Sequence, residues 1–177
     1  MDSLDSFDWS SLYQKYDDQC LGFDSDSKNL DFFTTNRPST DRELYCKLVE
    51  EFSNKPLPLI ANPIAIYEAL LYWKLYSQPA ARSNISKWLR DDLTLREAYQ
   101  KNLIKLFETL PPSLSRDVNE VLDIVKLIGD FRLAGMLTTN AFPVRTTFLH
   151  FLYPSTIPIF DKMVLKEVGM WSPNANH

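Results

Sequence analysis

Asp161 is the side chain in this sequence that is best placed for chemistry. It follows the apolar run IPIF at 157–160 and precedes further apolar residues at 163–168, where a helix is predicted to begin. A carboxylate at such a place could take part in acid–base or electrostatic catalysis. It could equally act only as the N-cap of the helix, and we expect this structural role.

His150 is a second candidate, since an imidazole near its ordinary pKa can serve as a general base. It shares a helical face with Thr146 and Tyr153. The alternative is a surface or hydrogen-bonded histidine, which we expect. The two histidines and the distant Cys20 and Cys46 have no zinc-site spacing and suggest no disulfide framework. The sequence also lacks phosphate-loop, dinucleotide and nucleophile-elbow motifs, so we expect no metal and no cofactor.

The elements that must position these side chains are two helices separated by prolines. Apolar residues recur at helical spacing over Val144–Tyr153, and Pro154 then ends that helix. Pro158 excludes Ile157 from a helix, so the second helix begins near Asp161.

Helices are predicted for the rest of the chain as well. Ile64–Ser77 is apolar nearly all round, so other helices must surround it. A stacking platform for bases is an alternative role for its aromatic residues. The helix after Ser115 carries an apolar stripe, and Gly129 and Gly135 bracket a break after it. The predicted helix starts are Thr40 with Glu43, Asn62 before Pro63, Thr94 with Glu97, and Ser115, with Asp91 and Asp92 as caps or dipole partners.

We therefore expect an all-α, single compact domain of about eight or nine helices around the central helix 64–77. We expect residues 1–38 to form an acidic helix and connector that pack on a helical domain, residues 39–177. Apolar residues make up 45% of the chain, enough for a core, and only four glycines argue against a β-rich fold. No transmembrane or signal segment is evident, and we expect a cytoplasmic protein.

Charge is distributed unevenly along the chain. Residues 1–31 hold eight acids and two bases, a balance of −6, whereas the other 146 residues hold 17 bases and 15 acids, a balance of +2. A nearly neutral body argues against extensive contact with nucleic-acid phosphates.

The segment IPIFDKMVLKEVG at 157–169 resembles the helix-hairpin-helix DNA glycosylase superfamily, especially its adenine-removing branch. The resemblance implies a glycosylase-like helical architecture and makes Asp161 the catalytic acid. It further implies that Arg145, Thr146, His150 and Lys162 contact nucleic acid, with DNA as partner.

The residues depart from that family at the hairpin. Its phosphate-binding glycine turn is replaced by Asn140–Arg145, which contains no glycine and includes Pro143. Arg145 stands near the place of the nucleophilic lysine of bifunctional members, and guanidinium cannot form a Schiff base. If the chain is active, the resemblance therefore implies a monofunctional glycosylase, and we expect no catalysis.

Two functions remain open at this point. One is a divergent glycosylase-like protein that binds nucleic acid. The other is a non-enzymatic helical module that kept the fold, lost the chemistry and binds a protein partner. A basic groove leading to Asp161 would favour the first, and an exposed apolar patch would favour the second.

Overall fold

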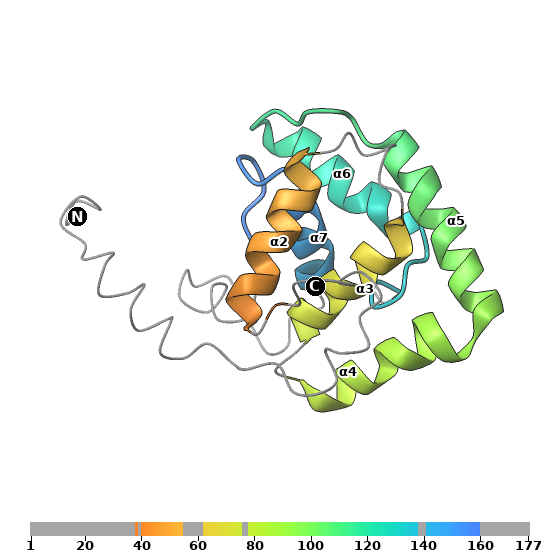
Figure 1. Cartoon of the computed structure of the whole chain (residues 1–177). Coiled ribbons are helices and arrows are strands. Elements are labelled where there is room, and N and C mark those ends of the chain that lie inside the picture. Colours follow the sequence, from red (N-terminus) through yellow and green to blue (C-terminus); the bar gives the residue numbers. More distant parts are fainter. Residues whose placement is uncertain (1–37, 39, 55–61, 76–77, 138–140, 160–177) are drawn as a thin grey trace, which may run out of the picture.

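The computed structural model describes residues 38, 40–54, 62–75, 78–137 and 141–159, and the secondary-structure elements in this part of the chain are helices joined by turns and loops (Figure 1). The predicted all-α class is confirmed for this part of the chain. The predicted helix at the start of the chain, Asp161 and Lys162 lie outside the described residues. The elements are α2 (Asp41–Asn54), α3 (Pro63–Leu75), α4 (Pro79–Ser86), the π-helical turn η4 (Lys87–Asp91), α5 (Leu93–Thr109), α6 (Val118–Asp130) and α7 (Phe142–Leu152).

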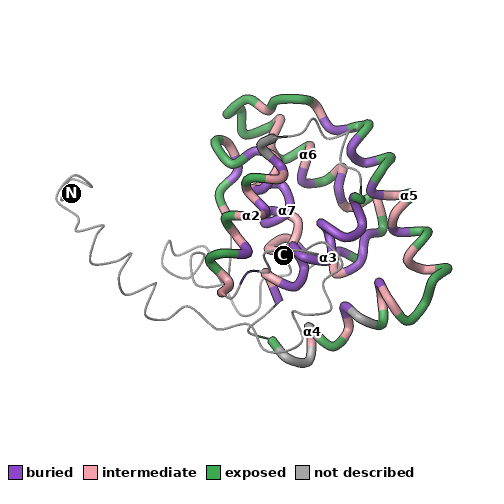
Figure 2. The backbone as a smooth tube through the Cα atoms, viewed as in Figure 1, coloured by how far each residue is buried: buried purple, intermediate pink, exposed green. Residues whose placement is uncertain are grey.

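The predicted central helix is confirmed. α3 contacts α2, α4, α5 and α7, and eleven of its residues are buried (Figure 2). The Tyr67 hydroxyl donates to the Ala134 carbonyl at 2.5 Å, so its polar end has a partner in the core. Glu68 is also fully buried, and the Nε of Arg90 on η4 lies 2.5 Å from its carboxylate. Tyr67 and Tyr72 are thus buried, and Trp73 packs partly buried against the core.

Two helix starts agree with the sequence. The Glu43 N–H donates to Thr40 Oγ1 at the start of α2, and the Ala65 N–H donates to Asn62 Oδ1 at the start of α3. Pro63 occupies the first position of α3, where its missing N–H costs no hydrogen bond.

Two other predicted N-caps, Thr94 and Ser115, are wrong, whereas the role of Asp92 as a cap is confirmed. α5 is capped by Asp92, which accepts the Leu95 N–H, so the Thr94 and Glu97 pair lies inside the helix. α6 is capped by Asp117, whose carboxylate accepts the N–H groups of Asn119 and Glu120. An aspartate at the N-cap position also interacts favourably with the helix dipole, so Asp92 and Asp117 stabilise the helices that they begin.

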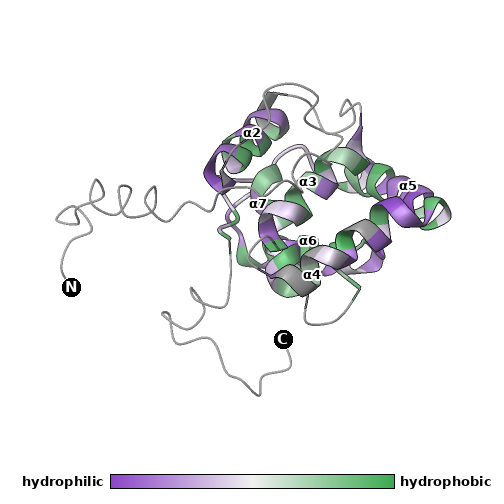
Figure 3. Cartoon of the chain, turned by 60° about the horizontal axis from the view of Figure 1, so that its bottom comes forward, coloured by the Kyte–Doolittle hydropathy of each residue, from purple (hydrophilic) through white to green (hydrophobic). Residues whose placement is uncertain are grey.

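The break between α6 and α7 also agrees with the sequence. α6 ends at Asp130, and Gly135 adopts a φ of 73°, a conformation that favours glycine. α6 then lies against α7, and α7 lies beside α2 (Figure 1). α5 lies at the outside and carries both hydrophobic and hydrophilic surfaces (Figure 3). No helix in the described part of the chain is long and apolar enough to cross a membrane.

Candidate functional site

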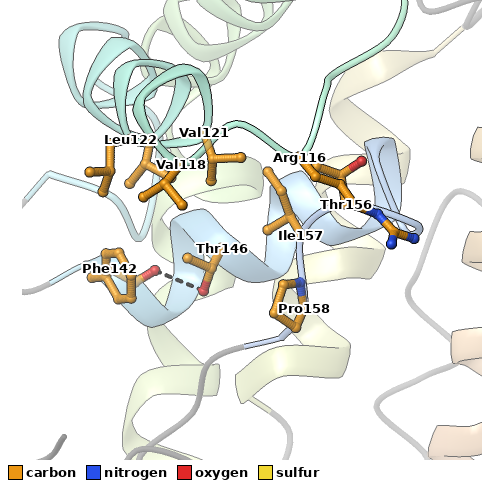
Figure 4. Close-up of a pocket in the computed structure, with 10 residues that line it drawn as sticks. Arg116, Val118, Val121, Leu122, Phe142, Thr146, Thr156, Ile157 and Pro158 are labelled. Carbon is orange, nitrogen blue, oxygen red and sulfur yellow. Dashed lines mark hydrogen bonds between the residues drawn. The ribbon is translucent and has the colours of Figure 1, made fainter.

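One concave surface among the described residues is a pocket of about 440 Å³ between α6, α7 and the loop after α7. We call it the α6–α7 groove. Figure 4 shows that α6 forms one wall and that α7 with the following loop forms the other. Its lining residues are Arg116, Val118, Val121, Leu122, Val125, Phe142, Thr146, Thr156, Ile157 and Pro158.

The α6 wall is an apolar stripe that extends beyond the core. Val118, Val121, Leu122 and Val125 follow helical spacing, and the sequence suggests that the whole stripe is buried. Val125 is indeed 8% exposed, but Leu122 is 45% and Val118 is 69% exposed. The N-terminal half of the stripe therefore presents apolar surface to the groove instead of the core.

The hydroxyl groups in the groove donate their hydrogens within the protein. Thr146 Oγ1 donates to the backbone carbonyls of Phe142 and Pro143, at 3.1 and 3.3 Å, and Thr156 Oγ1 donates to the Leu114 carbonyl at 3.1 Å. The N–H groups of Thr156 and Ile157 donate to the Tyr153 carbonyl, and Pro158 has no N–H. The groove therefore presents mainly carbon atoms and hydrogen-bond acceptors.

Arg116 is the cation of this lining. It is exposed at one end of the groove, and its Nη2 donates weakly to the Ser155 carbonyl at 3.4 Å. Tyr153 makes a second link between the segment before α6 and the end of α7, because its hydroxyl donates to the Pro111 carbonyl at 2.6 Å. Burial, with a smaller contribution from the charge of Glu120, raises the pKa of Tyr153 to about 12.

His150 lies on α7 and is hydrogen-bonded to the loop that follows this helix. A carbonyl oxygen only accepts, so His150 Nδ1–H donates to the Ile157 carbonyl at 2.8 Å. In the neutral ring, Nε2 then accepts from the Tyr45 hydroxyl at 2.9 Å. The Tyr45 and His150 rings also stack, with centroids 6.0 Å apart. Both nitrogens of His150 thus have structural partners that link α2 to the groove wall.

Arg145 is also engaged inside the protein. It is partly buried, and its Nη2 donates to the Met136 carbonyl at 3.3 Å. A Cβ added to Gly129 would lie 2.9 Å from Arg145 Nη1, so the guanidinium packs closely against the last turn of α6. Thr146 is 1% exposed. The structure therefore places three of the five candidate residues on α7 with partners of their own, and the assignment to nucleic acid stays a prediction.

Within the described residues, no group of His, Cys, Asp and Glu side chains is arranged to hold a metal ion. Sequence reasoning missed Val118, Leu122 and Phe142 as candidate binding residues. Their apolar character was visible, but nothing in the sequence distinguishes a stripe that packs in the core from one that lines a groove. Comparison with protein-family models, curated proteins and solved structures found no match.

Proposed function

We propose that the protein is a non-enzymatic helical module that binds an apolar face of a partner protein's helix in the α6–α7 groove. The single observation that carries the proposal is the exposed apolar stripe of Val118 and Leu122 inside a concave, apolar lining. Apolar surface of this kind, rimmed by polar residues, marks interaction sites.

The hydrogen bonding of the groove favours an apolar occupant. Since Thr146 and Thr156 donate within the protein, an anionic or base-like ligand would find few donors there besides Arg116. A helix that contributes apolar side chains at i, i+3, i+4 and i+7 needs no such donors, because its backbone groups are bonded internally.

The charge at the end of the groove specifies the partner further. Arg116 is exposed and lies where the α6 stripe begins, next to Val118. A partner helix with a carboxylate at the corresponding end would meet this guanidinium. An exposed pair of this kind adds orientation more than affinity.

The proposal is tested with a fluorescein-labelled, designed amphipathic helix of Leu, Ala, Glu and Lys. The parent protein should give saturable binding by fluorescence anisotropy. Leu122→Glu should weaken binding about tenfold or more, since a buried leucine contributes about 1.5–3 kcal/mol and 1.4 kcal/mol is a factor of ten.

Leu93→Glu is the matched control. Leu93 is 70% exposed on α5 and does not line the groove, so the same change adds the same charge elsewhere. Binding that both variants reduce equally would show nonspecific adsorption of the peptide, and absence of saturable binding would contradict the proposal.

A further inference from the structure

We infer that a second copy of this chain binds the outer face of α5, with the two α5 helices side by side and antiparallel. This contact is independent of the α6–α7 groove and of what that groove binds. α5 lies at the outside of the described part of the chain and contacts α3 and η4 there (Figures 1 and 3). Its buried residues, which form the inner face, are Tyr99, Leu103, Leu106 and Phe107.

The outer face of α5 carries two large apolar side chains. Leu93 is 70% exposed and Ile104 is 41% exposed. They stand eleven residues apart, which is about three turns of helix, so they project from the same side of α5. Glu97 and Gln100 lie between them, in the four–three–four spacing of a coiled-coil seam. The seam therefore has apolar residues at its two ends and polar residues in its middle.

This seam is complementary to itself when two copies lie antiparallel. If Leu93 lies opposite Ile104 of the second copy, two-fold symmetry makes the same apolar contact twice. The same register places Glu97 within one residue of Lys101 of the second copy, again twice. Glu97 and Lys101 are both exposed. A parallel pair in register would instead place each charge beside its own copy, which is unfavourable, so charge complementarity selects the antiparallel pair.

The length of α5 sets the strength of the contact. Its 17 residues extend for about 25 Å at 1.5 Å per residue. A contact confined to one helix of this length from each copy belongs to the small interfaces, below about 1,200 Å², which are weak and transient. We therefore expect a concentration-dependent equilibrium between monomer and dimer.

Self-association is tested by sedimentation equilibrium of the full chain, with a reductant present because Cys46 is exposed. The parent should dimerise reversibly, and Leu93→Glu should weaken the dimer about tenfold or more, because each dimer loses two apolar contacts. Val118→Glu is the matched control, since Val118 is 69% exposed on α6 and lies outside α5. Far-UV circular dichroism checks that both variants are folded. A parent that is monomeric at every concentration, or an equal effect of both variants, would overturn the inference.

Charge reversal tests the pairing of Glu97 with Lys101. Glu97→Lys and Lys101→Glu should each weaken self-association about threefold or more, because each change replaces two attractive pairs by two repulsive ones. An equal mixture of the two variants should recover the association, since one carries only positive charge at these positions and the other only negative charge. A mixture that associates no better than either variant alone would refute this register.

The antiparallel direction is tested by disulfide formation in a chain whose two native cysteines are replaced by serine. Under mild oxidation, Leu93→Cys chains mixed with Ile104→Cys chains should become linked. Leu93→Cys chains alone should not, because in the antiparallel pair the two copies of position 93 are eleven residues, or about 16 Å, apart along the axis. Efficient linking of Leu93→Cys to itself would overturn the antiparallel pair.

The outcome is separate from that of the proposed function. Leu122→Glu should weaken peptide binding and leave the dimer unchanged, whereas Leu93→Glu should weaken the dimer and leave peptide binding unchanged. If the chain binds the peptide but does not dimerise, the self-association fails and the proposed function stands. If it dimerises through α5 but does not bind the peptide, only the proposed function fails.

Discussion

Leu71 of the central helix α3 packs against Gly135 in the break between α6 and α7, and this contact gives a quantitative prediction about stability. Leu71 on α3 is 0% exposed, so Leu71→Ala should cost about 2–5 kcal/mol of unfolding free energy through the cavity it leaves. Gly135 has a φ of 73°, and a Cβ there would lie 3.2 Å from Leu71 Cδ2. Gly135→Ala should therefore cost stability for two separate reasons.

The two reasons can be separated by combining the substitutions. The left-handed backbone costs an alanine about 1–2 kcal/mol whatever its neighbours are. The crowding against Leu71 disappears when Leu71 is shortened. We therefore expect Gly135→Ala to cost less in the Leu71→Ala background, by at least about 0.5 kcal/mol, and to retain its backbone cost of about 1–2 kcal/mol.

Urea denaturation followed by far-UV circular dichroism measures all four proteins of this cycle. Gly129→Ala serves as the additive control, because its Cβ would meet Arg145 and not Leu71. Strict additivity of Leu71→Ala and Gly135→Ala, within about 0.3 kcal/mol, would refute the contact between α3 and the break. A neutral Gly135→Ala would refute the left-handed backbone.

Three further predictions concern titration, the buried ion pair and Asp161. Because the pKa of Tyr153 is raised to about 12, the folded state keeps the phenolic proton that the unfolded state loses near pH 10. The stability that Tyr153 contributes should therefore be present below about pH 10 and be lost as pH rises towards 12. The difference in melting temperature between the parent and Tyr153→Phe should shrink over that range, and a constant difference would contradict the prediction. Arg90→Met should destabilise the protein by up to about 3–5 kcal/mol, measured by urea denaturation, because it removes the guanidinium beside the buried Glu68 carboxylate. Adding Glu68→Gln should recover part of that loss, because it removes the buried negative charge. Asp161→Asn should leave the melting temperature unchanged, whereas Asp161→Ala should lower it, because losing an N-cap costs about 0.5–2 kcal/mol of stability. Neither variant nor the parent should release a base from mismatched oligonucleotides. Base release by the parent alone would instead indicate catalysis.

Sequence patterns predicted those elements whose signals are local and strong. The burial of α3 follows from an apolar surface on all sides, and the end of α7 follows from Pro154. Caps were harder to predict. Asp92 and Thr94 are both good N-cap residues, and only the structure shows that Asp92 has the extended backbone of a cap while Thr94 lies inside α5.

The candidate site was less predictable, because exposure is a tertiary property. The stripe on α6 is continuous in sequence, yet Ile128 is buried at one end and Val118 is exposed at the other. Which part of the stripe is covered depends on where α7 and its loop lie. The role of His150 was similar: its helical face was predictable, but its hydrogen bonds to Tyr45 and to the Ile157 carbonyl join residues far apart in the sequence.

Binding to DNA remains the alternative prediction, and the position of Arg145 decides how it must be tested. Arg145→Ala would remove the hydrogen bond to the Met136 carbonyl and the packing on Gly129, so it should lower stability whether or not DNA binds. A loss of DNA binding in this variant would therefore not identify a phosphate contact. The salt dependence of the parent is the better measurement, because each phosphate contact contributes a slope of about −0.9 to log K against log salt on duplex DNA. With a balance of only +2 over residues 32–177, we expect no complex with single- or double-stranded DNA in a mobility-shift assay at low salt. A complex whose salt-dependence slope corresponds to several phosphate contacts would contradict this expectation and favour the glycosylase-like function over the protein-binding module.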